Sequence, residues 1–263
     1  MKILVCTKLV PDTSETKISI DKTGKGISTV GLKFSINEAD DYAVEEAMRT
    51  KAALGGTVTI VSIAPKSADV MIRMALAKGG ESAIRIEDDR INFRDPMQVA
   101  KVLAAAVKDE KFDLVFTGCM SSDDKNMSVG VALAELLGLN HAAMVKHAEV
   151  TEEKVTVHRE LEGGLLEVAE VALPAVITVQ TGINTPRYAP IREMRQAMKK
   201  ELKVVNLEDI GVDEAQVNEA GSKIELLDFY FPEVISNVEI LEGSPEEKGE
   251  QIAIKLVKGG LLS

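Results

Sequence analysis

Short apolar runs alternate with longer segments of helical periodicity along the chain as far as Leu139. The apolar runs predict strands at Ile3–Thr7, Thr57–Ser62, Ser82–Ile86 and Leu114–Thr117. The helical segments, two of them closed by double glycines, predict helices at Asn37–Leu54, Ser67–Lys78, Pro96–Glu110 and Ser128–Leu139. This alternation predicts βαβ units with right-handed crossovers. We therefore expect an α/β fold with helices on both faces of a doubly wound, mostly parallel sheet.

The pattern changes between Ala142 and Val179. Strands are predicted at Val145–Val150, Lys154–Glu160 and Leu165–Val171, with the turn Glu162-Gly163-Gly164 between the last two. The apolar run Pro174–Val179 predicts one more buried strand. We therefore expect a β-hairpin appended to the main sheet.

The composition is that of an ordinary folded protein. Its 263 residues are 45% hydrophobic and 28% charged, which excludes disordered and fibrous chains. Only 3% of the residues are aromatic, and the formal net charge is −11. A base-stacking surface needs more aromatic residues, and a phosphate backbone needs positive charge, so we expect no nucleic-acid partner.

The negative charge is concentrated at the end of the chain. Residues 201–263 carry fourteen Asp and Glu against five Lys and Arg, whereas residues 1–200 are almost neutral. This shift predicts a globular domain over residues 1–200 and an acidic extension over residues 201–263. The extension also holds an apolar and aromatic cluster, which we expect to be buried against another surface. The cluster consists of Leu226, Phe229, Tyr230, Phe231, Val234 and Ile235.

Few residues indicate catalysis or metal binding. No two of His141, His147 and His158 have the spacing of a zinc-binding helix. Cys6 and Cys119 are too few for a disulfide framework or a four-thiolate metal site. No apolar run reaches the roughly 20 residues of a membrane-spanning helix, and a predicted strand begins within the first residues. We expect a reduced, cytoplasmic protein that has no catalytic or metal site and does not insert into a membrane.

The segment after the predicted strand Leu114–Thr117 is the main candidate binding site. Ligands of open parallel sheets bind beyond the carboxyl ends of the strands. Glycine there lets a ligand approach the backbone, and the polar residues can cap the next helix, whose free N–H groups hold phosphate. The candidate nucleotide-binding residues are Gly118, Cys119, Met120, Ser121, Ser122, Asp123, Asp124, Asn126, Met127, Ser128, Val129 and Gly130. A plain capped loop without a ligand is the alternative, and the spacing alone favours neither.

Other segments are expected at the same edge of the sheet. The loops after the first two strands contribute Lys8 and Ile63, and the helix start at Asn37, Glu38, Ala39 and Asp40 can close the site from the side. Cys6 and Cys119 also fall at strand ends that face this pocket. Their alternative role is that of small buried residues.

Four segments, in the family's order and spacing, resemble the β subunit of electron-transfer flavoproteins. They are Met1–Asp12, Asn37–Met48, Arg159–Gly164 followed by Leu173–Val176, and Asn184–Tyr188 followed by Lys199-Lys200. The resemblance covers nearly the whole chain. It implies a heterodimer with a homologous α subunit, which holds FAD, and an acidic C-terminal arm that wraps this subunit.

The resemblance also implies a function and a nucleotide. The chain would carry electrons between a dehydrogenase and a downstream acceptor, without catalysing a reaction of its own. The family's nucleotide loop matches Cys119–Gly130 without gaps, and it holds AMP in simple carriers or a second FAD in bifurcating members that oxidise NADH. Bifurcating members tend to have glycine where this chain has Asp124, which favours AMP. A stand-alone nucleotide-binding signalling protein of related fold is the further alternative.

The family's docking segment for a redox partner matches the region after Gly182. The partner-docking residues that it implies are Ile183, Asn184, Pro186, Arg187, Tyr188, Arg192 and Arg195. The composition of the segment also indicates a docking surface, because Thr185–Lys200 carries five basic residues and one acid among apolar ones. A solvated helix packed on the domain is the alternative. The family commonly has Leu-Arg-Leu where this chain has Thr181-Gly182-Ile183, so an acyl-CoA dehydrogenase and another partner both stay open.

Overall fold

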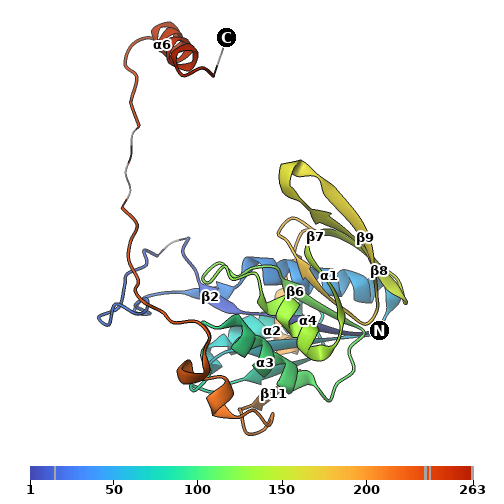
Figure 1. Cartoon of the computed structure of the whole chain (residues 1–263). Coiled ribbons are helices and arrows are strands. Elements are labelled where there is room, and N and C mark those ends of the chain that lie inside the picture. Colours follow the sequence, from blue (N-terminus) through green and yellow to red (C-terminus); the bar gives the residue numbers. More distant parts are fainter. Residues whose placement is uncertain (15, 234–235, 237, 262–263) are drawn as a thin grey trace. The chain divides into compact units, whose positions relative to one another are not determined.

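A computed structural model describes residues 1–14, 16–233, 236 and 238–261 of the chain (Figure 1). The chain divides into two units, Met1–Leu227 and Asp228–Ser263. The first unit contains the sheet, its covering helices and the candidate site. Val234 and Ile235, which were expected in the apolar cluster of the extension, lie outside the described residues.

Nine strands of the first unit form one sheet in the order β11-β5-β4-β1-β6-β10-β7-β8-β9 (Figure 1). The strands are β1 (Lys2–Cys6), β4 (Thr57–Ile63), β5 (Ser82–Ile86), β6 (Leu114–Gly118), β7 (Asn140–Val150), β8 (Lys154–Glu160), β9 (Leu166–Ala172), β10 (Ala175–Val179) and β11 (Glu201–Val205). From β11 to β7 all pairings are parallel, and β8 and β9 continue the sheet in antiparallel fashion. The predicted mostly parallel sheet is confirmed.

Helices cover both faces of this sheet, as β1 illustrates. Ile3 and Val5 point into one core cluster and Leu4 into the other, because successive side chains of a strand alternate between faces. The first cluster includes side chains of α1 (Glu38–Leu54), α2 (Asp69–Ala77) and α5 (Ile191–Ala197). The second includes side chains of α3 (Pro96–Val107) and α4 (Val129–Leu137). The doubly wound arrangement is therefore confirmed.

Short elements complete the first unit. Two strands, β2 (Leu9–Pro11) and β3 (Phe34–Ile36), form an antiparallel ladder of their own. The 3₁₀ turns are η1 (Lys66–Ala68), η2 (Glu162–Gly164), η3 (Glu214–Gln216) and η4 (Glu219–Gly221). β2 begins just after Lys8 and β3 ends just before Asn37, so the segment from β2 to β3 starts and ends beside predicted site residues.

The appended hairpin begins earlier than predicted. β7 starts at Asn140 rather than Val145, because its first residues pair in parallel with β10, Asn140 opposite Ala175 and Ala142 opposite Ile177. Val145 lies opposite both Val179 of β10 and Arg159 of β8, and β7 continues to pair with β8 beyond a register shift after Val145. One strand therefore joins the main sheet and also forms a side of the hairpin.

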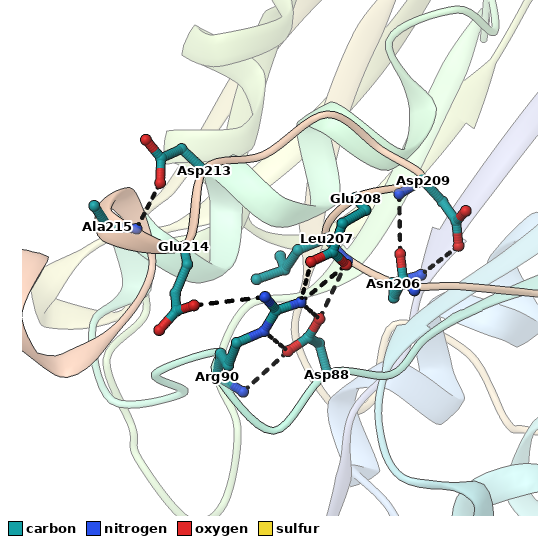
Figure 2. Close-up of polar contacts among 9 residues, drawn as sticks. All are labelled: Asp88, Arg90, Asn206, Leu207, Glu208, Asp209, Asp213, Glu214 and Ala215. Carbon is teal, nitrogen blue, oxygen red and sulfur yellow. Dashed lines mark hydrogen bonds and ion pairs between the residues drawn. The ribbon is translucent and has the colours of Figure 1, made fainter.

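The first unit continues beyond residue 200, where the charge pattern predicted its end. β11 extends the sheet by pairing with β5, and Leu207 and Val217 are buried in the second core cluster. Two acids of this stretch, Glu208 and Glu214, form ion pairs with one arginine (Figure 2). The Arg90 guanidinium contacts Asp88 at 2.6 Å, Glu208 at 2.7 Å and Glu214 at 3.5 Å. Residues 201–227, expected in the acidic extension, thus belong to the α/β domain.

The connection from β10 to β11 crosses the sheet. These strands follow one another in the chain, but β6, β1, β4 and β5 lie between them in the sheet. The connection contains α5 and most of the predicted docking segment. It packs on the face that α1 and α2 cover, since Ala197 of α5 shares their core cluster.

The second unit contains α6 (Pro245–Lys258), which begins with a capping box formed by Ser244 and Glu247. No residue of α6 is buried. Several large apolar side chains of this unit are exposed, namely Phe229, Tyr230, Phe231, Val238, Ile240, Ile252, Ile254 and Val257. None of the helices in the described part of the chain is long and apolar enough to cross a membrane.

Candidate functional site

A pocket lies at the carboxyl ends of β1 and β6, beside the first residues of α1 and α4. The structure brings most of the predicted nucleotide-binding residues together there. Its lining includes Cys6, Lys8, Asn37, Asp40, Ile63, Gly118, Cys119, Met120, Ser121, Asp124, Asn126, Met127, Ser128, Val129 and Gly130. Four other predicted residues, Glu38, Ala39, Ser122 and Asp123, are not part of this lining.

Asp40 ties together the two loops that frame the pocket. Its Oδ2 accepts the backbone N–H of Lys8 at 2.8 Å, and its Oδ1 accepts that of Gly118 at 3.1 Å. The side chain is buried, and this burial raises the pKa of Asp40 to about 7, although the hydrogen bonds oppose the shift. Asp40 therefore positions the loops after β1 and β6.

Asn37, directly before α1, also positions the loop after β6 through hydrogen bonds. Its Nδ2 donates to the backbone oxygen of Met120 at 2.9 Å, and its Oδ1 accepts the N–H of Ser122 at 3.1 Å. Its own N–H donates to the oxygen of Lys8 at 2.9 Å. The buried start of α1 thus sets the shape of the pocket wall.

Gly118 is required by this same packing. A Cβ at this position would lie 2.3 Å from Asp40 Oδ1 and 2.8 Å from the Cβ of Ala39. Gly130 is equally confined, because a Cβ there would lie 2.5 Å from Thr178 Cγ2. The absence of a side chain at Gly118 thus lets α1 pack against the end of β6, and the approach of a ligand to Gly118, which also lines the pocket, stays a prediction.

The first turn of α4 offers free backbone donors to the pocket. The predicted side-chain cap of this helix is absent, because Ser128 Oγ donates to the oxygen of Asn126 at 2.6 Å and makes no cap hydrogen bond. The preceding Lys125 and Met127 adopt the left-handed conformation, with φ of 53° and 55°. Such strain is typical of functional loops. A helix N-terminus without a side-chain cap suits an anion.

Lys8 bridges the two sides of the pocket mouth. Its ammonium lies 2.8 Å from Asp123 and also pairs with Asp124, and Ser121 Oγ is 3.4 Å away. The side chain is only partly buried. Lys8 and the first residues of α4 thus both line the pocket, and the Lys8 charge is paired with these two carboxylates.

The two thiols at the pocket differ in access. Cys6 is buried, and its burial, with a smaller contribution from the charge of Asp40, raises the pKa of the thiol. Cys119 is half-buried, and burial also raises its pKa. Neither environment creates a reactive thiolate.

One wall of the pocket was not predicted from the sequence. This wall comes from the connection between β5 and α3 and from α3 itself, and it contains Phe93, Pro96, Val99 and Leu103. β5 is also parallel to β1, so its carboxyl end opens on the same edge of the sheet. The rule that ligands bind beyond the carboxyl ends of parallel strands was applied to β1, β4 and β6. Applied to β5 as well, it would have predicted this wall.

Part of the predicted docking segment is tied to the domain. Ile183 is buried in the first core cluster. Asn184 Nδ2 donates to the backbone oxygen of Tyr42 at 3.0 Å and to Glu46 Oε2 at 2.9 Å. Arg187 binds the Glu45 carboxylate through both Nε and Nη2 at 2.8 Å. These contacts with α1 hold the segment in place.

The remainder of the segment faces solvent. Tyr188 is 92% exposed, and Ile191 and Met198 are 75% and 65% exposed. The predicted docking residues Arg192 and Arg195 are also exposed, whereas Pro186 is half-buried. The segment therefore presents apolar and basic side chains between points anchored on α1 and α2.

Comparison with known proteins gives consistent matches. A family model described as "Electron transfer flavoprotein domain" matches residues 26–210. The chain is 36% identical over 256 residues to "Electron transfer flavoprotein subunit beta" of Methylophilus methylotrophus, covering 96% of each chain. Proteins of the same name from Bacillus subtilis and Mus musculus are 34% and 37% identical, covering 96% and 81% of this chain and 96% and 84% of their own lengths. The chain therefore belongs to the electron transfer flavoprotein family, among its β subunits.

Proposed function

We propose that this chain is the β subunit of a heterodimeric electron carrier that passes electrons between a dehydrogenase and a downstream acceptor. Its relatives are named as β subunits, which supports an α subunit as partner. The electron-carrying chemistry is that of FAD held mainly by the α subunit. This chain would contribute the pocket, the exposed docking segment and a terminal unit with exposed apolar side chains.

The pocket at the start of α4 is proposed to bind AMP. The uncapped N-terminus of this nine-residue helix is the observation that carries the proposal, because its free N–H groups match a phosphate. Lys8 would add a positive charge from the facing loop. Asp40 and Asn37 would hold both loops around the nucleotide through their four hydrogen bonds to the backbone.

The exposed part of the docking segment is proposed to meet the redox partner. It combines the apolar Tyr188, Ile191 and Met198 with the basic Arg192 and Arg195. Apolar side chains bury area in a complex, and the charges select and steer an acidic partner. Asn184 and Arg187, by contrast, serve to anchor the segment on α1.

The second unit is proposed to be the arm that holds the α subunit. Its exposed aromatic group, Phe229, Tyr230 and Phe231, and the apolar side chains of α6 have no core of their own. Exposed apolar side chains that gather in a short segment indicate an interaction site. The arm therefore begins after Leu227 rather than after residue 200.

Nucleotide extraction from the intact heterodimer tests the proposal. The chain is co-produced with its α subunit, and FAD and AMP are counted per heterodimer. We expect a yellow complex with one FAD and one AMP. Two FAD molecules and no AMP would instead indicate the bifurcating, NADH-oxidising form. A colourless chain that binds nucleotide without an α subunit would indicate a stand-alone nucleotide-binding protein and overturn the proposal.

A further inference from the structure

The lining of the nucleotide pocket combines two chemically different sets of residues. The α4 N-terminus, Lys8 and Ser121 suit a phosphate and a sugar. The apolar set, Phe93, Val99 and Leu103, comes from the connection between β5 and α3 and from α3 itself, and it offers no side-chain hydrogen-bonding group. A mononucleotide combines the same two kinds of group, an anionic phosphate and a flat base.

Phe93 supplies an aromatic face to the apolar set. Among the described residues that line the pocket, Phe93 is the one aromatic side chain. It is 41% exposed, although it belongs to a connection whose neighbouring Ile91 is buried in the core. An aromatic side chain that is exposed at the wall of a pocket is accessible to a ligand bound there.

The backbone on both sides of Phe93 is held firmly. The N–H of Asn92 donates to the oxygen of Val217 at 2.7 Å. Arg94 Nη2 donates to the oxygen of Lys25 at 2.6 Å. The buried Asp95 caps α3 through the N–H of Met97 at 2.9 Å. The connection cannot easily shift, so the aromatic ring is held in position before a ligand arrives.

We propose that Phe93 is the wall on which the base of the bound nucleotide stacks, with Val99 and Leu103 behind it. This inference rests on the proposed nucleotide function of the pocket, and it places the phosphate at α4 and the base at α3. Every base has a π-face, so stacking on Phe93 contributes affinity for the base without reading its hydrogen-bonding groups. Phe93 is thus a specificity-determining residue that separates nucleotides from simple phosphates.

The test compares two ligands that differ only in the base. Nucleotide-free full-length chain, in complex with its α subunit, is titrated calorimetrically with AMP and, by competition, with ribose 5-phosphate. Phe93→Ala should weaken AMP binding by about tenfold or more, as expected for a lost base–aromatic stack. It should leave competition by ribose 5-phosphate unchanged. Phe93→Leu, which keeps an apolar side chain but removes the π-face, should show most of the loss.

Met97→Ala is the matched control. Met97 is 43% exposed and lies in the first turn of α3, but it does not line the pocket. Its substitution should leave both ligands unaffected, and thermal melting should show all variants folded. Tight AMP binding by Phe93→Ala would overturn the proposed stacking of the base on Phe93 but not the proposed nucleotide pocket. Failure of the unaltered protein to bind AMP would overturn both proposals.

Discussion

Arg73 of α2 and Lys200, which follows α5, each donate hydrogen bonds to backbone carbonyls at the end of the other's helix. Arg73 Nη1 donates to the backbone oxygens of Ala197 at 2.8 Å and of Lys200 at 2.6 Å, at the end of α5. Lys200 Nζ donates to the oxygens of Leu76 at 2.8 Å and Gly80 at 2.5 Å, at the end of α2. Cations are favourable there because the last carbonyls of a helix have no intrahelical partner. This reciprocal cap holds the end of the docking segment on the domain.

Arg73→Ala should therefore loosen α5. Two partly buried carbonyls lose a charged donor, so we expect the free energy of unfolding to fall by about 1.5–3 kcal/mol. Amide hydrogen exchange over residues 191–200 should accelerate. Arg192→Ala removes an exposed arginine from the same segment and is the matched control. Identical exchange in the two variants would show that the cap does not hold α5.

Asp40 should make stability depend on pH. Burial raises its pKa to about 7 in the folded protein, against about 3.9 in an unfolded chain. The folded state thus keeps a proton that the unfolded chain releases, so the contribution of Asp40 is complete below about pH 4 and is lost as the pH rises through about 7.

Chemical denaturation of the unaltered protein and of Asp40→Asn, at pH values from about 4 to about 8, measures this effect. The variant does not titrate at this position. The stability of the unaltered protein relative to the variant should decrease across this range by a few kcal/mol, at roughly 1.36 kcal/mol per unit of pKa shift. A relative stability that stays constant over this range would show that Asp40 is ionised throughout in the folded protein.

Gly118→Ala should destabilise the protein and disturb the pocket. The new Cβ would press on Asp40 and Ala39 at 2.3 and 2.8 Å, and such overpacking costs about 1–3 kcal/mol. Gly249→Ala is a suitable control, because its Cβ enters open space on α6. That substitution should be neutral or stabilising, since alanine favours a helix. Unchanged denaturation midpoints for Gly118→Ala would mean that α1 can move away.

A bound nucleotide should protect Cys119 from alkylation. Cys119 lines the pocket and is half-buried, whereas Cys6 is buried in the sheet. Because its raised pKa keeps the Cys119 thiol protonated near neutrality, the labelling is carried out at alkaline pH and followed by mass spectrometry. We expect less label on Cys119 with AMP than without it, and little on Cys6 in either state. Equal labelling of Cys119 would move the nucleotide away from this loop.

Two truncations separate the domain from the arm. A chain ending at Leu227 should remain folded and lose its hold on the α subunit, because it lacks only the second unit. A chain ending at Lys200 should misfold, since it lacks β11 and the buried Leu207 and Val217. Circular dichroism and co-elution with the α subunit measure the two effects. Full co-elution of the chain ending at Leu227 would contradict the proposed arm.

Much of the fold could be predicted because it rests on local patterns. The continuous apolar runs of β1 and β6 and the glycine-terminated α1 are visible in the sequence, and parallel-sheet geometry then brings Lys8 and the loop after Gly118 together. β11 was missed because its short run lies beside many acids. Its pairing with β5, and the neutralisation of Glu208 and Glu214 by Arg90, are long-range features that charge counting does not reveal.

The roles of single residues were harder to predict than their location. Gly118 and Asp40 line the pocket as predicted, but their hydrogen bond between β6 and α1 was not foreseen. The ion pair between Arg187 and Glu45 was not foreseen either, and the contact of Arg187 with a partner stays a prediction. Each role depends on a contact between residues far apart in the sequence, and composition and spacing carry no information about such contacts.

The crossing from β10 to β11 constrains how this surface can evolve. Five interstrand spacings separate the two strands, a span of about 24 Å. The chain between them must cover that distance while fastened to α1 and to α2. An insertion or deletion would disturb the anchored path between β10 and the edge strand β11, whereas a substitution at Tyr188, Ile191 or Met198 changes only what faces outward. Partner choice in this lineage should therefore diversify by exchange of side chains at constant loop length.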